Sequence, residues 1–289
     1  MGINRNAIIG FPRWTQELEL SGGTWEESYP VENLGRLPLS RVARSVGLGP
    51  LQTRFTAILR KSRPIQILGL IRHNFSRSAT IRIRIFADIS GQVLLHDETL
   101  DAWPVVYPVD QLAWESDSFW DGRYSEDEMS GYSWTRPILL PKVMLARRID
   151  FLITDLSNPN GYIDIGMVEV AQGWQLGVNF DWDASYGFDF RSTSTRALGG
   201  ADHFTQLDKP RVFQGQVTGL DRGEAMSQAF ELHRQMDLCN QFLWMPDPGE
   251  PLHWLRTVFL ARNSNPGLLR YAHVKTDTIP LSFIEVIES

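Results

Sequence analysis

The sequence has 289 residues, of which 43% are hydrophobic and 21% are charged. At roughly 150 residues per domain this length predicts two domains, and the composition excludes a disordered tail or a collagen-like fibre. The 28 basic residues against 34 acidic ones leave a formal charge of −6, which argues against a general nucleic-acid-binding protein. Ten tryptophans are the unusual feature of the composition.

The first part of the chain has the pattern of an antiparallel β-sandwich. Between residues 79 and 86 every second residue is an isoleucine, and the positions between include Arg82 and Arg84. This alternation predicts a half-buried strand with its arginines on the solvent or partner face. Short apolar runs at 65–71, 149–153 and 163–165 are bounded by Gly, Pro and Asn. We therefore expect a sandwich over residues 1–173.

A long insertion at about 103–136 mixes acids with aromatic side chains. Its acids over 117–128 allow three interpretations: a glycosidase acid pair, a solvated loop whose rings pack on the protein or a partner, or a sugar-binding loop. The residues alone leave these open and assign no catalytic group. The rings that are candidates for interface or sugar contact are Trp103, Trp114, Phe119, Trp120, Tyr124, Tyr132 and Trp134.

One turn places several side-chain oxygens close together in sequence. Asp155, Asn158, Asn160 and Asp164 are candidate Ca²⁺ ligands, although Asn and Asp also favour turns by bonding their own backbone. The six histidines are scattered without metal-ligand spacing, and neither a nucleophile-elbow nor a phosphate-loop motif is present. We expect no enzyme and no cofactor, and this turn is the one metal-site candidate.

The character of the chain changes near residue 173. Asp221 and Glu224 resemble a helix-capping box, and apolar residues then recur with helical spacing, which predicts one main helix over about 222–239. Strand-like runs follow at 241–245, 257–261, 270–274 and 280–287. Residues 174–289 are therefore expected to form a second β domain.

The single cysteine, Cys239, cannot form an internal disulfide, which fits folding in a reducing cytoplasm, and we expect it to be buried after the helix. The start of the sequence lacks the basic and apolar segments of a signal peptide, and no apolar run is long enough to predict a membrane span.

Three stretches resemble discoidin-like, galactose-binding-type β-sandwiches. Tyr29–Leu34 reads Y-P-V-E-N-L, similar to the opening of such modules, and His73–Ser76 followed by Ala79–Ile83 resembles their core motif. Arg148–Phe151 leading to Asp155–Gly166 resembles their closing hairpin, especially in the version found in tail proteins of long-tailed bacteriophages.

The later part of the chain is similar in layout to the tail-tube-like ring domain of phage distal tail proteins. The resemblance implies a virion structural protein of the tail tip or baseplate, assembled in the host cytoplasm as a homo-oligomeric ring. Its implied partners are the tail tube, the baseplate hub and the tape measure, with no direct sequence-specific nucleic acid. The alternative is a carbohydrate-binding module that recognises a host-surface glycan, and the third hypothesis is a glycan-active enzyme.

Overall fold

A computed structural model describes residues 5–108, 118, 120–197, 199–265 and 267–287. The chain divides into two compact units. The first comprises Met1–Gln175 and Leu243–Val258, and the second comprises Leu176–Phe242 and Phe259–Ser289. The segment Leu243–Val258 returns to the first unit after the chain has entered the second, so no single position along the sequence separates the two units.

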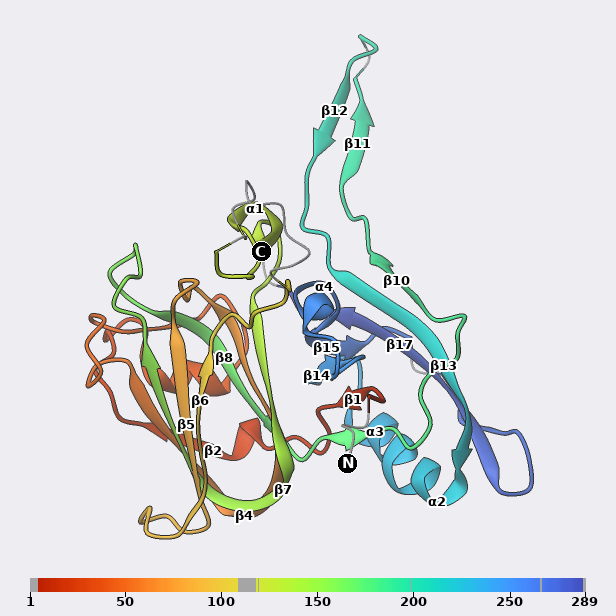
Figure 1. The fold of residues 1–289 in the computed structure, drawn as a ribbon. Coiled ribbons are helices and arrows are strands. Elements are labelled where there is room, and N and C mark those ends of the chain that lie inside the picture. The colour runs from red at the N-terminus through yellow and green to blue at the C-terminus, as the bar shows by residue number, and fades with distance from the viewer. Residues whose placement is uncertain (1–4, 109–117, 119, 198, 266, 288–289) are drawn as a thin grey trace. The chain divides into compact units, whose positions relative to one another are not determined.

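The first unit contains an antiparallel β-sandwich built on two long strands, β4 (Arg54–His73) and β7 (Thr135–Thr154). These strands pair with each other across two register shifts, at Ile58/Arg63 and Ile65/Ile67. Figure 1 shows them curving at one end of the unit, so that each contributes to both layers. The other strands of this sheet are β2 (Leu18–Ser21), β3 (Ala43–Arg44), β5 (Thr80–Phe86), β6 (Leu94–Asp101) and β8 (Asp164–Ala171).

The order of these strands follows from where the long strands bend. Before the bend β4 pairs with β2, and the matching part of β7 pairs with β5, which in turn carries β6 at the edge. After the bend β4 pairs with β8, which carries β3. All of these pairings are antiparallel, as the short runs bounded by turn residues predict.

The core of the sandwich lies between the two layers. Ile81, Ile83 and Ile85 of β5 are buried while Arg82 and Arg84 are exposed, which confirms the alternation in the sequence. Across the strand pair, the rings of Phe55 and Phe151 stack with their centroids 4.7 Å apart. Each such side chain contributes about 1.5–3 kcal/mol by leaving water, so the inward positions determine the fold of this unit.

The stretches that carry the sequence resemblance join one end of the sandwich. The side chain of Asn74 donates to the carbonyl of Tyr162 at 3.1 Å and accepts from the N–H of Asp164 at 2.8 Å. The carboxylate of Asp155 accepts from the N–H of Ser76 at 2.9 Å. These bonds connect segments far apart in sequence, so the motif residues have a structural role in closing the hairpin.

Short elements complete the first unit. β1 (Ile8–Ile9) pairs with β9 (Trp174–Gln175) on one side and with the end of β14 (Gln241–Met245) on the other. Its helical turns are η1 (Thr15–Glu17), η2 (Val31–Gly35), α1 (Glu126–Met129), η5 (Pro251–His253) and α4 (Trp254–Thr257). In the described part of the chain, no helix has the length and apolar character needed to span a bilayer.

The second unit contains an antiparallel sheet and one helical segment. The sheet runs in the order β10 (Ser185–Phe188), β13 (Arg211–Asp221), β17 (Thr276–Glu285) and β15 (Phe259–Asn263), and β16 (Arg270–Tyr271) also pairs with β17. The helical segment is shorter than expected and comprises α2 (Arg222–Glu224), the π-helical turn η4 (Ala225–Ala229) and α3 (Phe230–Gln235).

The start of that helical segment shows the Asp221 half of the predicted capping box, while Glu224 accepts a hydrogen bond from the N–H of Gly177 at 2.9 Å. The side chain of Asp221 accepts from the N–H of Gly223 at 2.8 Å, which satisfies one of the free donors of the first turn. Ala225, Ala229 and Leu232 are buried, as their helical spacing predicts. Cys239 is exposed rather than buried, because it lies in the turn between α3 and β14.

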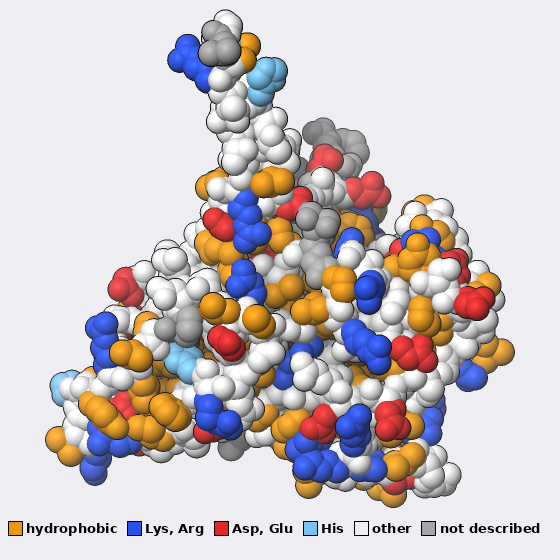
Figure 2. Space-filling model, turned by 180° about the vertical axis from the view of Figure 1, so that it is seen from behind, with side chains coloured by type: hydrophobic (Ala, Val, Ile, Leu, Met, Phe, Trp, Pro, Cys, Tyr) orange, Lys and Arg blue, Asp and Glu red, His pale blue; other side chains and the backbone are white. Residues whose placement is uncertain are grey.

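A two-stranded ribbon extends from this sheet. β11 (Thr193–Arg196) and β12 (Asp202–Thr205) pair with each other from Thr193–Thr205 to Arg196–Asp202. Figure 1 shows the ribbon continuing beyond the ends of β10 and β13, and all eight of its strand residues are exposed. In the space-filling view the ribbon is largely free of hydrophobic side chains, which gather instead at its base (Figure 2).

Candidate functional site

Two of the rings predicted to contact a sugar or a partner are buried in the first unit. The indole N–H of Trp103 donates to the carbonyl of Phe75 at 3.0 Å, and its ring meets that of Trp134 edge to face at 5.1 Å. The hydroxyl of Tyr124 donates to the carbonyl of Pro251 at 2.8 Å, and burial raises the pKa of Tyr124 to about 12. Trp103 and Tyr124 thus belong to an aromatic cluster inside the unit.

The other aromatic candidates lie nearer the surface or outside the described residues. Trp134 and Tyr132 are half-buried and pack against the sandwich core, and the indole of Trp134 donates to the carbonyl of Met129 at 3.0 Å. Trp120 is 86% exposed. Trp114 and Phe119 lie outside the described residues. Of the five rings that the structure describes, Trp120 is the one that lies in solvent.

Two described acids of the insertion, Asp121 and Glu128, have structural partners. The carboxylate of Asp121 accepts from Arg77 Nη2 at 2.6 Å. The carboxylate of Glu128 accepts from the N–H of Ser125 at 3.0 Å, as the second half of a capping box at the start of α1. Burial alone would raise the pKa of Glu128, but hydrogen bonds led by the one from Tyr107 lower it overall. A lowered pKa is opposite to what a general acid requires.

The four candidate Ca²⁺ ligands do not converge on one point. Asp155 is buried and accepts from Asn158 Nδ2 at 2.9 Å, and Asn158 in turn accepts from the N–H of Asn160 at 3.0 Å. Asp164 instead forms two 2.8 Å hydrogen bonds with the guanidinium of Arg44. Across the described ranges, no group of three or more His, Cys, Asp and Glu side chains is arranged to hold a metal ion.

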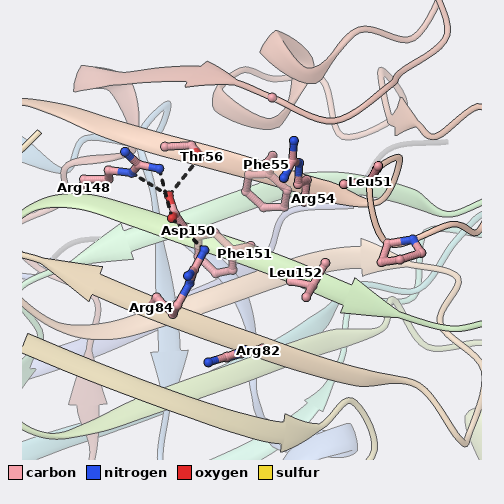
Figure 3. Close-up of a pocket in the computed structure, with 12 residues that line it drawn as sticks. Leu51, Arg54, Phe55, Thr56, Arg82, Arg84, Arg148, Asp150, Phe151 and Leu152 are labelled. Atoms are coloured by element: carbon pink, nitrogen blue, oxygen red, sulfur yellow. Dashed lines mark hydrogen bonds and ion pairs between the residues drawn. The ribbon is translucent and has the colours of Figure 1, made fainter. Parts of the chain in front are cut away.

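A hollow lies on the outward face of the sandwich sheet, where β4, β7 and β5 run side by side (Figure 3). We call it the arginine groove, and its volume is about 410 Å³. It is lined by Gly22, Pro50, Leu51, Arg54, Phe55, Thr56, Arg82, Arg84, Arg148, Asp150, Phe151 and Leu152.

The register of the three strands arranges the groove in rows. Arg54 of β4 lies opposite Leu152 of β7, which lies opposite Arg82 of β5. In the next row on this face, Thr56 lies opposite Asp150, which lies opposite Arg84. Because neighbouring strands are about 4.8 Å apart, the two outer backbones of each row are separated by roughly 10 Å. In the first row the apolar side chain of Leu152 therefore lies between two arginines. In the second row the carboxylate of Asp150 lies between polar groups of β4 and β5.

Asp150 is the electrostatic centre of the groove. Its carboxylate accepts from Arg148 Nε at 2.7 Å, from the hydroxyl of Thr56 at 2.9 Å and from Arg84 Nη2 at 3.3 Å. The side chain of Asp150 is only 10% exposed, whereas that of Arg84 is 47% exposed. The carboxylate thus holds two guanidinium groups at the surface while it is itself shielded from water.

The groove carries excess positive charge although the chain is acidic overall. Arg82 forms an ion pair with Asp97 of β6, with contacts of 2.7 and 2.8 Å. Arg54 is exposed and has no ion pair or side-chain hydrogen bond within the described ranges. The four arginines face two acids, Asp97 and Asp150, which leaves a surplus of two positive charges. Such a surface attracts anions.

Apolar side chains form part of the groove wall beside the arginines. Leu51 extends from the loop before β4 and is 67% exposed, and Leu152 lies between the arginines of its row. Figure 3 shows Arg84 and Arg148 on opposite sides of Asp150. The sequence indicated only that Arg82 and Arg84 point outward. It carried no signal that Arg54 and Arg148 from other strands would lie beside them, since strand order is not encoded in local alternation.

No protein-family model matches the sequence, and no curated protein matches it either. Solved structures with a similar fold include a family 32 carbohydrate-binding module from C. perfringens in complex with galactose, with 10% identity and a TM-score of 0.37, covering 57% of this chain and 98% of that one. A second C. perfringens module, in complex with GlcNAc-α-1,4-galactose, has 16% identity and a TM-score of 0.36, covering 59% and 96%. A mutant lectin-binding domain of lectinolysin, complexed with Lewis b, has 8% identity and a TM-score of 0.38, covering 57% and 98%. Likeness at this level transfers neither residues nor ligands to this chain.

Proposed function

We propose that this chain is a carbohydrate-binding protein whose first unit holds its ligand in the arginine groove. The observation that carries the proposal is the groove itself, a hollow of about 410 Å³ on the outward face of a sheet, with guanidinium groups beside aliphatic walls. This volume lies in the range of small-molecule sites. Guanidinium groups present planar sets of N–H donors, whose hydrogen bonds hydroxyl and carboxylate oxygens accept. Aliphatic side chains suit the C–H faces of sugar rings.

The sequence agrees with this class of ligand, because the stretches around Tyr29–Leu34 and His73–Ser76 resemble galactose-binding-type sandwiches. The proposal places the ligand on the sheet face rather than on the loops that such modules use. It includes no chemical step, since Asp121 is engaged in an ion pair and Glu128 in a helix cap.

A glycan array probed with the full chain tests the proposal, and galactose-containing glycans are the first probes. We expect saturable binding that the double substitution Arg54→Gln and Arg84→Gln removes. Binding to no glycan on the array would overturn the proposal. Binding removed by Trp120→Ala but retained in the double variant would move the ligand site to the exposed ring of the insertion.

A second candidate function is a ring-building component of a phage tail tip, and the ribbon of β11 and β12 favours it. A two-stranded ribbon with both faces in water is marginally stable alone, and its unpaired edges are available to another chain. Phe204 of β12 is 77% exposed, and Phe190, which lies between β10 and the ribbon, is 74% exposed. Such features fit a segment that packs against a neighbouring copy in a ring.

Sedimentation of the full chain over a range of concentrations tests this second candidate. We expect self-association that weakens when residues 190–208 are replaced by a short turn. The sugar-binding proposal predicts no effect of that replacement on glycan affinity, so the two functions are measured separately.

A further inference from the structure

We propose that the ligand of the arginine groove is an acidic saccharide, a sugar that carries a carboxylate or a sulfate. This inference rests on the proposed function and names its ligand class. The surplus of two positive charges, on a chain whose formal charge is −6, gives the groove a sign opposite to the average of the molecule. A neutral sugar gains nothing from that surplus, whereas an anionic group does.

The arginines of the groove differ in how firmly they are held. Arg82 donates from two guanidinium nitrogens to Asp97 of β6. Arg148 likewise donates from two nitrogens to Asp150, at 2.7 and 3.1 Å. Arg84 reaches Asp150 through a single contact of 3.3 Å, and Arg54 has no such contact within the described ranges. Arg54 and Arg84 are therefore the groups with donors left for a ligand.

These two arginines lie on either side of Leu152. Arg54 is directly opposite it across β4 and β7, and Arg84 is one row further along on β5. A sugar ring seated on Leu152 would present an anionic substituent to both guanidinium groups. A charge-assisted pair of this kind is stronger and more directional than a hydrogen bond between neutral groups. Asp150 is then a positioning residue, which holds Arg84 and Arg148 in place without touching the anion.

The test measures the affinity of the full chain for three matched sugars by ligand-observed NMR titration: galactose, galacturonic acid and galactose 6-sulfate. Inorganic sulfate serves as the anion without a sugar. We expect at least one acidic sugar to bind at least about tenfold more tightly than galactose and than inorganic sulfate. We also expect the affinity for the acidic sugar to fall as salt is raised, because the arginines are exposed.

The matched variants are Arg54→Gln in the groove and Arg60→Gln as the control. Arg60 is an exposed arginine of the same strand, roughly 20 Å further along, so both substitutions remove one positive charge. We expect Arg54→Gln to weaken binding of the acidic sugar about five- to tenfold and Arg60→Gln to leave it within about twofold. A thermal melt of each variant establishes that both are folded.

The outcomes separate the inference from the proposed function. Equal binding of galactose and the acidic sugars, unaffected by Arg54→Gln, overturns the inference and leaves a carbohydrate-binding protein. Inorganic sulfate binding as tightly as the acidic sugars overturns it too, since the sugar ring then contributes nothing. Binding of none of these sugars, with no glycan retained on the array, overturns both. A preference between the carboxylate and the sulfate identifies the anion.

Discussion

Strand β5 of the first unit and the β11–β12 ribbon of the second are both extended segments with exposed polar side chains, but they are stabilised differently. Along β5, Ile81, Ile83 and Ile85 are buried beneath Arg82 and Arg84. Along β11 and β12 every residue is exposed. An arginine on β5 is therefore presented by a packed layer, whereas a side chain on the ribbon is presented by strand pairing alone.

The difference indicates where each kind of function belongs. A groove that recognises a small ligand requires donors held within a fraction of an ångström, which a rigid sheet supplies. A ribbon without a core has few contacts to lose when it bends, and it gains stability when a partner covers it. The groove is therefore better suited to a small ligand, and the ribbon is better suited to contact with another protein chain.

The largest expected effect on the free energy of unfolding comes from a substitution in the buried layer beneath the groove. Phe151 is 1% exposed and stacks on Phe55, so Phe151→Ala removes buried contacts and leaves a cavity. We expect the free energy of unfolding to fall by about 3–5 kcal/mol, measured by chemical denaturation. If Phe151→Ala does not fold, the milder Phe151→Leu takes its place, with a smaller loss expected. A loss below about 1 kcal/mol for the alanine variant would contradict the idea that this layer is rigid.

A buried histidine makes the stability of the first unit depend on pH. Burial, with a contribution from the charge of Arg136, lowers the pKa of His73 to about 3. The imidazole of His73 takes up a proton near pH 6.5 in the unfolded chain but only near pH 3 in the folded chain. The contribution of the neutral His73 to the free energy of unfolding is therefore complete above pH 6.5 and is lost as the pH falls toward 3. The slope is about 1.4 kcal/mol per pH unit.

Denaturation between pH 7 and pH 5 measures this slope, because most carboxylates titrate below that window. His233 of the second unit, whose pKa burial also lowers, adds a slope of the same sign. The comparison is therefore with His73→Phe, which keeps an aromatic ring beside Phe75 and has no titrating group. We expect the variant to have a shallower pH dependence. Identical slopes in the two proteins would show that His73 takes up its proton in the folded state as well.

The acid at the centre of the groove has a smaller expected effect. Asp150→Asn removes the charge that holds Arg84 and Arg148, so we expect a loss of about 1–3 kcal/mol in unfolding free energy, reduced by the exposure of both arginines. Asp97→Asn is the control, because Asp97 pairs with Arg82 at the exposed edge, and its loss should be smaller. Equal losses for the two variants would mean that Asp150 has no special positioning role.

The sequence allowed the sandwich to be predicted because its inward positions repeat with period two, as at Ile81, Ile83 and Ile85. It did not allow the groove to be predicted. Arg54, Arg84 and Arg148 belong to three strands, and their meeting depends on the antiparallel order of β4, β7 and β5. Register and order come from packing of the whole unit, which no local pattern specifies.

The aromatic excess illustrates the same limit. Trp103 and Trp120 stand in one acid-rich insertion and look alike in sequence, yet the first is 5% exposed and the second 86%. What separates them is the neighbourhood of Trp103: the fold brings Phe75 to it from outside the insertion and Trp134 from the other end of the insertion. The composition showed an excess of tryptophan, but it did not show which rings are buried. That distinction depends on the packing of the folded unit.

The smallest expected effect on stability is on the ribbon, and it completes the comparison of the two regions. Phe204 of β12 is 77% exposed, so Phe204→Ala leaves no cavity and should change the unfolding free energy by no more than about 0.5 kcal/mol. The same substitution that disrupts the sandwich at position 151 is therefore nearly neutral here. If the ribbon packs against another chain, Phe204→Ala should weaken self-association in sedimentation while the melt is unchanged. A large loss of stability in the isolated chain would instead mean that the ribbon is part of a core, and the division between the rigid groove and the unsupported ribbon would no longer hold.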